Sequence, residues 1–260
     1  MSDTSLYVDT ESFLHRLDPR AKLILLLAMF VPAYTFGRPE FIAIPFVAAL
    51  VGLWIGGGLR NLRRVWFIIV ALFVVGLVVW PGFVERGGPV IVDAGPVFLT
   101  EKQGLFALGR SLRITSFILG GLVYVSTTSN EEIVRGMRGF GLPYAFCFAV
   151  GTALRLFPTF LDAAGTVRQA QEARGLEISS KNPIDRARAF IPLLLPVFMT
   201  AFRNIETQSM ALEARGFDTR SERTFYGASS FATRDWLAIV ATVAVAVASI
   251  ALSTVGVGTF

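Results

Sequence analysis

The sequence predicts an all-α integral membrane protein with about five transmembrane helices and a cytoplasmic region of long amphipathic helices. Three observations predict this fold class. The chain of 260 residues is 53% hydrophobic and only 17% charged, whereas soluble domains carry about 25% charged residues. The apolar residues are grouped in runs, which is typical of membrane proteins. The long region between the fourth and the last run is basic and amphipathic, and it contains one charged octapeptide twice.

The single cysteine and the single histidine limit the chemistry that the chain can perform. Cys147 lies in an apolar run and is interpreted as a packing residue, while His15 precedes the first run and is interpreted as an interfacial residue. No intramolecular disulfide is possible and no cluster has metal-site spacing, so we expect no metal and no cofactor bound by this chain. The net charge of +5 indicates basic cytoplasmic loops rather than a nucleic-acid partner.

Five apolar runs are the predicted membrane spans. The first is short for a helix that needs roughly 20 residues to cross a bilayer, but Ala21 and the side-chain stems of Arg20 and Lys22 can extend it. Acidic residues precede this run and further runs follow it, so it is interpreted as a retained span and not as a cleaved signal peptide. The five runs are Leu23–Phe36, Phe41–Ile55, Val65–Val84, Leu105–Val125 and Trp236–Val257.

Two features stand out around the fourth run. Residues Glu85–Gln103 are rich in glycine and proline, which predicts a loop with a short strand-like or re-entrant piece. Arg110 and Arg113 lie near the start of the run, where charges are costly. Two placements are open for this pair: toward the bundle interior or another subunit, or snorkelling toward the lipid headgroups.

The region of residues 126–235 is expected to consist of amphipathic helices punctuated by proline and glycine. Its apolar stretches Tyr144–Phe160 and Phe190–Phe202 are too short, or too interrupted by charge and proline, to span. They are predicted to lie at the membrane–cytoplasm interface. The helices that follow them are predicted to stop at Gly175 and Gly216, because glycine is the commonest residue after a last helical turn.

The distribution of lysine and arginine predicts the orientation of the chain. These residues are dense in the loop at Arg60–Arg64 and in the region 126–235, and sparse in the loops at the other ends of the spans. Basic loops remain in the cytoplasm, which places the N-terminus inside and the C-terminus outside. The predicted division is therefore membrane helices in residues 1–125, a cytoplasmic or interfacial region in 126–235 and a last membrane helix in 236–260.

The repeated octapeptide is Ala170–Glu177 (AQEARGLE), which recurs as Ala211–Asp218 (ALEARGFD). Each copy ends a predicted helix. Helix capping alone is one explanation, because glycine favours the cap and arginine complements the helix dipole. Capping leaves the wider match unexplained, including the acidic residue that follows. The other explanation is docking: an arginine at a helix tip can pair with a partner carboxylate through two hydrogen bonds, and two copies indicate two similar partner subunits or one dimer.

Further segments carry a resemblance to a known family. Leu17–Lys22 (LDPRAK) resembles the family's DPR-K opening. Thr127–Glu132, followed by Gly139–Pro143, resembles its segment before the coupling helices, and Leu154–Pro158 (LRLFP) resembles its R-(F)-P element. Together with the two Ala-Arg-Gly signatures, these segments make nearly the whole chain similar to the transmembrane (T) component of energy-coupling factor (ECF) transporters, the CbiQ/EcfT family.

The resemblance implies a non-catalytic subunit of an ATP-driven importer in the cytoplasmic membrane of a prokaryote. T components bridge two cytoplasmic ABC-type ATPases, which bind ATP and Mg, and a small membrane substrate-binding (S) component for a vitamin or a transition-metal ion. The residues that the resemblance assigns to ATPase docking are Ala173, Arg174, Gly175, Ala214, Arg215 and Gly216, with Glu172, Glu213, Arg155 and Pro158 in supporting positions.

The residues themselves argue against other classes of membrane protein. The chain has no Gly-x4-Gly-Lys-Ser/Thr segment, so it cannot bind ATP through a P-loop. A self-contained secondary transporter, or another membrane scaffold, is the alternative, but the sequence repeat lies only in the cytoplasmic region and not in broken membrane helices. A membrane-embedded enzyme would need converging acidic or histidine residues inside its spans, which hold almost none.

Overall fold

The structure is a computed structural model, and it describes residues 7–8, 10, 12–84, 89–94, 97–176, 183–218, 231–256 and 258. Two compact units are considered one at a time: the bundle unit, Met1–Phe140 with Ala228–Phe260, and the helix-pair unit, Gly141–Gly227. The elements are α1 (Pro19–Thr35), α2 (Pro39–Ile55), α3 (Leu59–Val79), the 3-10 helix η1 (Trp80–Phe83), β1 (Val90–Ala94), β2 (Val97–Thr100), α4 (Glu101–Thr127), α5 (Asn130–Gly139), α6 (Tyr144–Ala173), α7 (Pro183–Ala214) and α8 (Thr233–Thr254).

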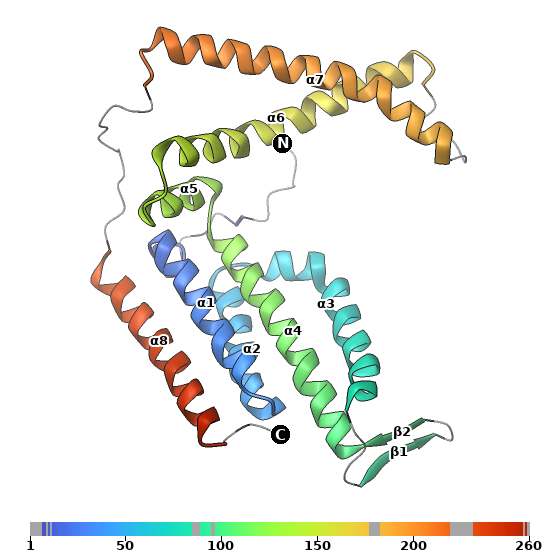
Figure 1. Cartoon of the computed structure of the whole chain (residues 1–260), viewed down its shortest axis with the longest axis vertical. Helices are drawn as coiled ribbons and strands as arrows, with labels where there is room; N and C mark the ends of the chain where they lie inside the picture. Colours follow the sequence, from blue (N-terminus) through green and yellow to red (C-terminus); the bar gives the residue numbers. More distant parts are fainter. Residues whose placement is uncertain are drawn as a thin grey trace. The chain divides into compact units, whose positions relative to one another are not determined.

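Helix α4 is the centre of the bundle unit. It contacts α1, α2 and α3, while α8 packs along α1 (Figure 1). The buried core between α2, α3 and α4 is formed by Ala49, Leu53, Ile69, Leu119 and Leu122. The unit therefore packs around one helix that is half-buried along its length, while the outer faces of its neighbours stay exposed.

Small residues allow the helices of the bundle unit to approach one another closely. A Cβ at Gly109 of α4 would lie 2.7 Å from the carbonyl oxygen of Gly37, and one at Gly76 of α3 would clash with Ser111 of α4. Close backbone approach at small residues is the usual basis of helix association in membranes, where lipid removes the hydrophobic drive. These two glycines therefore fix how tightly α4 sits against its neighbours.

The multi-pass character is confirmed, but the set of candidate spans differs from the predicted one. Four helices in the described part of the chain are long and apolar enough to cross a membrane: α3 with η1, α4, α6 and α8. Helices α1 and α2 have only 17 residues each, or about 25 Å of helix. The sequence predicts that charge and proline interrupt the apolar start of α6 too much for a span. This prediction was wrong, because the helix continues through Arg155 and Pro158 and is long enough to cross a membrane.

The glycine- and proline-rich loop after the third span contains the predicted strand-like piece. Strands β1 and β2 form an antiparallel hairpin, in which Val92 pairs with Leu99. The hairpin leads into α4 through a capping box, because the backbone N–H of Thr100 donates to Oε1 of Gln103 at 3.3 Å. The amide of Gln103 also donates to the carbonyl oxygens of Pro81 and Val84, at 3.0 and 3.1 Å. One side chain thus joins the end of η1 to the start of α4.

The two arginines of α4 take different positions. Arg113 is buried and donates from Nη2 to the carbonyl oxygen of Phe36, just after the last turn of α1. Its guanidinium also lies 5.5 Å from the ring centroid of Tyr34. Arg110 lies against the rings of Phe106 and Trp80, at 5.0 and 5.8 Å. Arg113 therefore points into the bundle, where it satisfies a carbonyl left free at a helix end.

Helices α6 and α7 of the helix-pair unit are longer than the sequence predicts. Each is continuous through residues that were expected to separate an apolar stretch from an amphipathic helix. Pro196 lacks the N–H that would bond to the carbonyl of Pro192. That carbonyl instead accepts a hydrogen bond from Nε2 of Gln171 in α6, at 3.5 Å. A partner from the neighbouring helix thus replaces the missing bond, so the proline does not end α7.

The two long helices run antiparallel. Gln171, near the end of α6, meets Pro192 in the first third of α7. At the other end, the ring of Phe217, just after α7, lies 4.6 Å from that of Phe148 and 6.3 Å from that of Tyr144, at the start of α6. Each C-terminal end therefore lies beside the N-terminal part of the other helix, and the ends of the two helices that carry the repeat point in opposite directions (Figure 1).

Candidate functional site: two arginine-bearing helix tips

Both Ala-Arg-Gly segments lie at helix ends, as predicted. Helix α6 ends at Ala173 and α7 at Ala214. The glycines that follow adopt positive φ angles, 89° at Gly175 and 65° at Gly216. Residues with a Cβ are strained in this left-handed conformation, and glycine is not. The sequence repeat is therefore a repeat of backbone geometry as well.

The hydrogen bonds of the two caps match one for one. At the first tip, Leu176 N–H donates to the Gln171 carbonyl at 3.0 Å, and Gly175 N–H donates to that of Glu172 at 3.0 Å. The corresponding bonds at the second tip join Phe217 to Leu212 at 3.0 Å and Gly216 to Glu213 at 2.9 Å. This pair of bonds defines the Schellman motif, which satisfies carbonyls that a helix end leaves without partners.

Capping explains several features of the octapeptide. It requires the glycine, and it favours an apolar residue directly afterwards, because that residue packs back on the structure. Phe217 does so on the start of α6, and Leu176 is partly buried. The glutamate of each copy bonds back along its own helix: Glu172 accepts from Arg168 at 2.8 Å, and Glu213 accepts from Ser209 at 3.5 Å.

Capping does not use the arginine side chains. Arg174 and Arg215 are exposed, as are the alanines before them. A Cβ built on Gly175 or Gly216 would meet nothing within 4 Å. Among the residues that the structure describes, neither guanidinium forms an ion pair. Each tip thus presents an arginine with its five N–H donors available, on a small and rigid turn.

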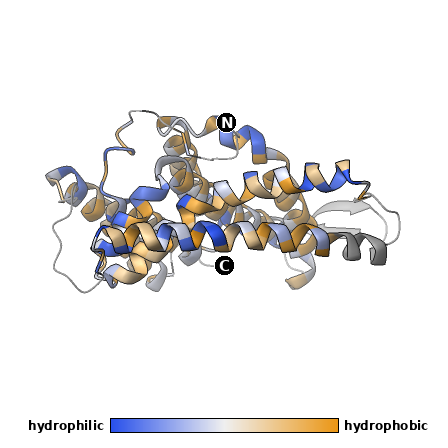
Figure 2. Ribbon diagram, turned by 90° about the horizontal axis from the view of Figure 1, so that it is seen from above, coloured by the Kyte–Doolittle hydropathy of each residue, from blue (hydrophilic) through white to orange (hydrophobic). Residues whose placement is uncertain are grey.

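The antiparallel pairing separates the two tips widely. Arg174 lies at one end of the pair, and Arg215 at the other. About 25 residues of α7 separate Arg215 from the part of that helix beside Arg174, which corresponds to roughly 40 Å at 1.5 Å per residue. In Figure 2, hydrophilic residues gather toward the ends of α6 and α7 that carry the motifs. One small partner cannot engage both tips in the same way, whereas two copies of one partner can.

The remaining predicted residues lie away from the tips. Arg155 and Pro158 are exposed in the first half of α6, about 25 Å along the helix from Arg174. Cys147 is buried, and its thiol donates to the carbonyl of Leu142 at 3.8 Å, in line with packing. His15 bonds to Ser12 at 2.7 Å and to the carbonyl of Val8 at 2.8 Å. Within the described residues, no group of three or more His, Cys, Asp or Glu residues could hold a metal ion.

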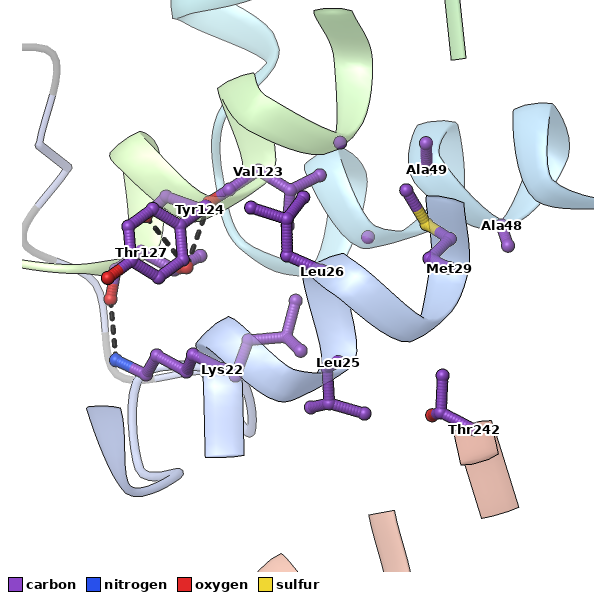
Figure 3. A pocket seen from close by; sticks show the side chains of 13 residues that line it. Lys22, Leu25, Leu26, Met29, Ala48, Ala49, Val123, Tyr124, Thr127 and Thr242 are labelled. Carbon is purple, nitrogen blue, oxygen red and sulfur yellow. Dashed lines mark hydrogen bonds between the residues drawn. The ribbon is translucent and has the colours of Figure 1, made fainter. Parts of the chain in front are cut away.

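The bundle unit contains a cavity of about 240 Å³ between α1, α2 and α4, with Thr242 of α8 at its edge (Figure 3). Its walls are mainly apolar and include Leu26, Met29 and Val123. Lys22 lies at one end, where its amine donates to the carbonyl of Thr127 at 2.7 Å. The polar side chains in its lining are those of Lys22, Tyr124, Thr127 and Thr242.

One buried polar cluster was not predicted from the sequence. It joins Asp18 and Lys22 of the LDPRAK segment to Glu132 and Asp235, whose partners lie more than a hundred residues away along the chain. Burial of Asp235, at 2% exposure, is unusual for a carboxylate beside a membrane span. The available signal was the coincidence of an acidic residue directly before the last span and a DPR-K opening before the first.

The chain is similar to known proteins along most of its length. The family model described as CbiQ, cobalt transport protein, matches residues 10–226. The chain is similar to proteins named "Energy-coupling factor transporter transmembrane protein EcfT" from three bacteria. These are from Brevibacillus brevis (33% identity; 91% of this chain and 92% of the relative), Thermosediminibacter oceani (32%; 94% and 95%) and Staphylococcus aureus (28%; 96% and 97%).

These alignments run nearly from end to end, and the family model covers helices α1 to α7 together with both Ala-Arg-Gly tips. The chain belongs to the CbiQ/EcfT family, the transmembrane component of energy-coupling factor transporters.

Proposed function

We propose that this chain is the coupling subunit of an ECF-type importer. It transmits ATP-driven movement of two cytoplasmic ATPases to a small membrane S component, which takes up a vitamin or a transition-metal ion. The observation that carries the proposal is the pair of identically capped, exposed arginine tips at opposite ends of α6 and α7. ATP and Mg belong to the ATPases in this proposal, and this chain binds no cofactor.

The geometry of the helix pair favours two partner subunits. Two antiparallel helices with the same motif at each end are related by an approximate two-fold axis across the pair. A dimer of similar ATPases presents the same groove twice about its own two-fold axis. One tip for each ATPase is then the simplest match between the two symmetries. Arg174 and Arg215 would each pair with a carboxylate through the planar guanidinium.

A second surface of the helix pair suits the S component. Large apolar side chains recur along α7 at spacings of four and three residues, and each is 50–67% exposed. Such a pattern forms one continuous stripe on a helix and packs against an apolar partner helix. An exposed patch of this kind marks an interaction site or contact with lipid. The stripe is formed by Ile191, Leu195, Phe198, Phe202 and Ile205.

We propose that α6 lies along the membrane surface although its length and composition permit a span. If α6 crossed the membrane, the segment after it would lie outside. That segment, residues 174–234, carries nine lysines and arginines. Such a basic segment outside would violate the positive-inside rule. A surface position for α6 and α7 keeps both arginine tips on the ATPase side.

The test is reconstitution of the complete complex. The chain is coexpressed with two ABC-type ATPases and a small S component from the same genome, purified through a tag on the chain and placed in liposomes. We expect all four subunits in one complex, ATP-dependent uptake by the complex and no ATP hydrolysis by the chain alone. Uptake by the chain without the ATPases would instead favour a self-contained secondary transporter.

The sidedness is tested by labelling. In a Cys147→Ser background, cysteines at Arg155 and Arg203 are exposed to a membrane-impermeant maleimide in whole cells, with Tyr34 near the predicted outer end of α1 as the positive control. We expect labelling at position 34 only. Labelling of position 203 from outside would show that α6 crosses the membrane and would overturn the surface position of the helix pair.

A further inference from the structure

The LDPRAK segment at the start of α1 is buried although it is rich in charge. Within the bundle unit, Asp18 is 6% exposed and Lys22 is 5% exposed. Charged side chains are almost never buried to this degree unless they are paired. The Lys22 side chain finds its partners at the α4–α5 junction. The Asp18 carboxylate caps α1 by accepting the N–H of Arg20, and the Asp18 backbone N–H binds the start of α8.

Lys22 fastens α1 to the junction of α4 and α5. Its Nζ donates to the carbonyl of Thr127, the last residue of α4, at 2.7 Å (Figure 3). It also pairs with Oε2 of Glu132, in the first turn of α5, at 3.1 Å. The same oxygen accepts the backbone N–H of Ser129 at 3.0 Å and so completes the capping box of α5. Lys22 therefore binds the group that starts α5.

Close packing strengthens this attachment of α5. A Cβ at Gly136 would lie 3.2 Å from the Cβ of Pro19. At Gly139 an added Cβ would clash with the guanidinium of Arg20, which covers that glycine. Two turns of α5 thus rest directly on the segment that also carries Lys22.

Asp18 fastens the same segment to α8. Its backbone N–H donates to Oδ1 of Asp235 at 3.0 Å. The other oxygen of Asp235 accepts the N–H of Ala232, the N-cap residue of α8, at 2.8 Å. The guanidinium of Arg20 lies 5.6 Å from the ring centroid of Phe231, directly before α8. The start of α8 is thus held to the start of α1 by a carboxylate and a cation–π contact.

The two attachments hold the elements that precede and follow the helix-pair unit in the chain. The helix-pair unit, residues 141–227, is inserted between α5 and α8. The chain enters it directly after α5 and leaves it a few residues before α8. Both covalent connections to the helix pair therefore start from elements that are fastened to residues 18–22. Displacement of the helix pair that is carried by the chain therefore reaches α5 and α8, both of which are attached to this segment.

The cluster also has unused hydrogen-bonding capacity. Oδ2 of Asp18 and the Nε atoms of Arg20 and Arg135 are buried and have no hydrogen-bond partner among the described residues. The polar network around residues 18–22 is therefore only partly satisfied.

We propose that Asp18, Lys22, Glu132 and Asp235 form an anchor that passes movement of the coupling helices to the membrane bundle. These are positioning residues for coupling and not docking residues. The inference rests on the proposed function, because it needs a helix pair that is moved by partner subunits. It assigns to the DPR-K segment a task separate from that of the Ala-Arg-Gly tips.

The test separates coupling from folding and from docking. In the reconstituted complex, Glu132→Gln removes the charge but keeps an oxygen to cap α5, and Asp235→Asn does the same at α8. The ATPases should remain bound and hydrolyse ATP as before, while uptake per ATP hydrolysed falls about tenfold. Lys102→Met, which alters an exposed lysine in the first turn of α4, is the control and should change neither quantity.

A reversible crosslink supplies a second readout. Disulfide-bonded residues have Cβ atoms about 3.5–4.5 Å apart, which is close to the separation at Pro19 and Gly136. Pro19→Cys with Gly136→Cys, in a Glu132→Gln and Cys147→Ser background, should regain coupling when oxidised and lose it again on reduction. A purely structural pair would lower the yield of complex and leave uptake per ATP unchanged, which would overturn the proposal. Loss of the ATPases from the wild-type complex would instead refute the proposed function.

Discussion

A charged side chain at the start of α1 is buried, whereas those at the tips of α6 and α7 are exposed. In the bundle unit, Lys22 is buried, Glu132 is partly buried, and the two side chains are bonded to each other at 3.1 Å. Arg174 and Arg215 of the helix-pair unit are exposed, and within the described residues they form no ion pair. All four residues lie at helix ends, where charge also interacts with the helix dipole. Position at a helix end therefore does not distinguish the two groups, but their partners do.

The difference separates charges that fix the architecture from charges that are kept for a partner. Removing one member of a buried pair costs about 3–5 kcal/mol, because the other charge stays buried. An exposed pair, such as Arg168 with Glu172 at 2.8 Å, contributes about 1 kcal/mol at most. An arginine without an ion pair contributes even less to the stability of the fold, but its guanidinium remains available to bind a partner.

The largest effect is expected when the charge of both tip arginines is reversed. Arg174→Glu with Arg215→Glu should release both ATPases. A central arginine costs about 2 kcal/mol or more on truncation, and distant sites add. The sum of about 4 kcal/mol corresponds to a roughly 1000-fold loss of affinity, before any repulsion between carboxylates. Copurification measures the loss, and the thermal unfolding midpoint of the variant should match that of the wild type.

A substitution outside the motifs controls for net charge. Arg203→Glu changes the charge of the helix pair by as much as the reversal of one tip arginine, at an exposed position outside the tips. This control should keep both ATPases. If the double tip variant also retains them and supports full uptake, docking is wrong and the arginines serve only the helix caps.

Removal of the buried Lys22 should lower the stability of the fold, whereas removal of an exposed tip arginine should not. Lys22→Met leaves the partly buried Glu132 without its partner, and we expect a loss of up to about 3 kcal/mol in the free energy of unfolding of the isolated chain. Arg174→Met should change that free energy by less than about 0.5 kcal/mol. Unfolding of both variants in the same detergent measures the contrast. Equal losses would mean that burial does not separate the two groups of charges.

Single substitutions measure how much each tip arginine contributes to the affinity for an ATPase. Arg174→Ala or Arg215→Ala should weaken ATPase binding by about 2 kcal/mol, or roughly 30-fold. Lysine at either position should restore only part of the affinity, because it lacks the planar fork that bonds to both carboxylate oxygens. Titration of purified ATPase against the chain in nanodiscs gives the affinities. Full rescue by lysine would indicate attraction by charge alone.

The local parts of this structure were predictable from sequence. The runs of apolar residues identify the bundle helices, and both C-terminal stops were predicted at Gly175 and Gly216, where the backbone does turn left-handed. Caps depend on a few neighbouring residues, so a short sequence contains the information. The Ala-Arg-Gly repeat therefore located the candidate site without any knowledge of how α6 and α7 pack.

The parts that were missed depend on contacts between distant residues. In α7, the carbonyl of Pro192 that Pro196 leaves free accepts a hydrogen bond from Gln171 of α6. The buried cluster depends on pairs that are separated by 110 residues in one case and by 217 in the other. No local pattern predicts such a pair, because each member taken alone resembles an ordinary interfacial charge. Tertiary packing thus overrides the local signals of proline and charge.

A smaller difference exists between the two tips themselves. The ring of Phe217 packs against that of Phe148 at 4.6 Å, in a tilted arrangement, and so holds the second tip against the start of α6. Leu176, its counterpart at the first tip, is partly buried and has no aromatic ring. An aromatic pair of this kind contributes about 0.5–1.5 kcal/mol. The second tip is therefore expected to be the more rigid of the two.

Phe217→Ala should loosen the second tip and leave the first unchanged. The amides of Gly216 and Phe217 donate to carbonyls at the end of α7, so their hydrogen exchange should become faster once the ring contact is lost. A loss of about 1 kcal/mol corresponds to roughly fivefold faster exchange and a similar weakening of binding through Arg215. Leu176→Ala is the matched substitution and should have a smaller effect at its own tip. Equal acceleration at both tips would show that the Schellman bonds alone hold each arginine in place, without help from the packing between α6 and α7.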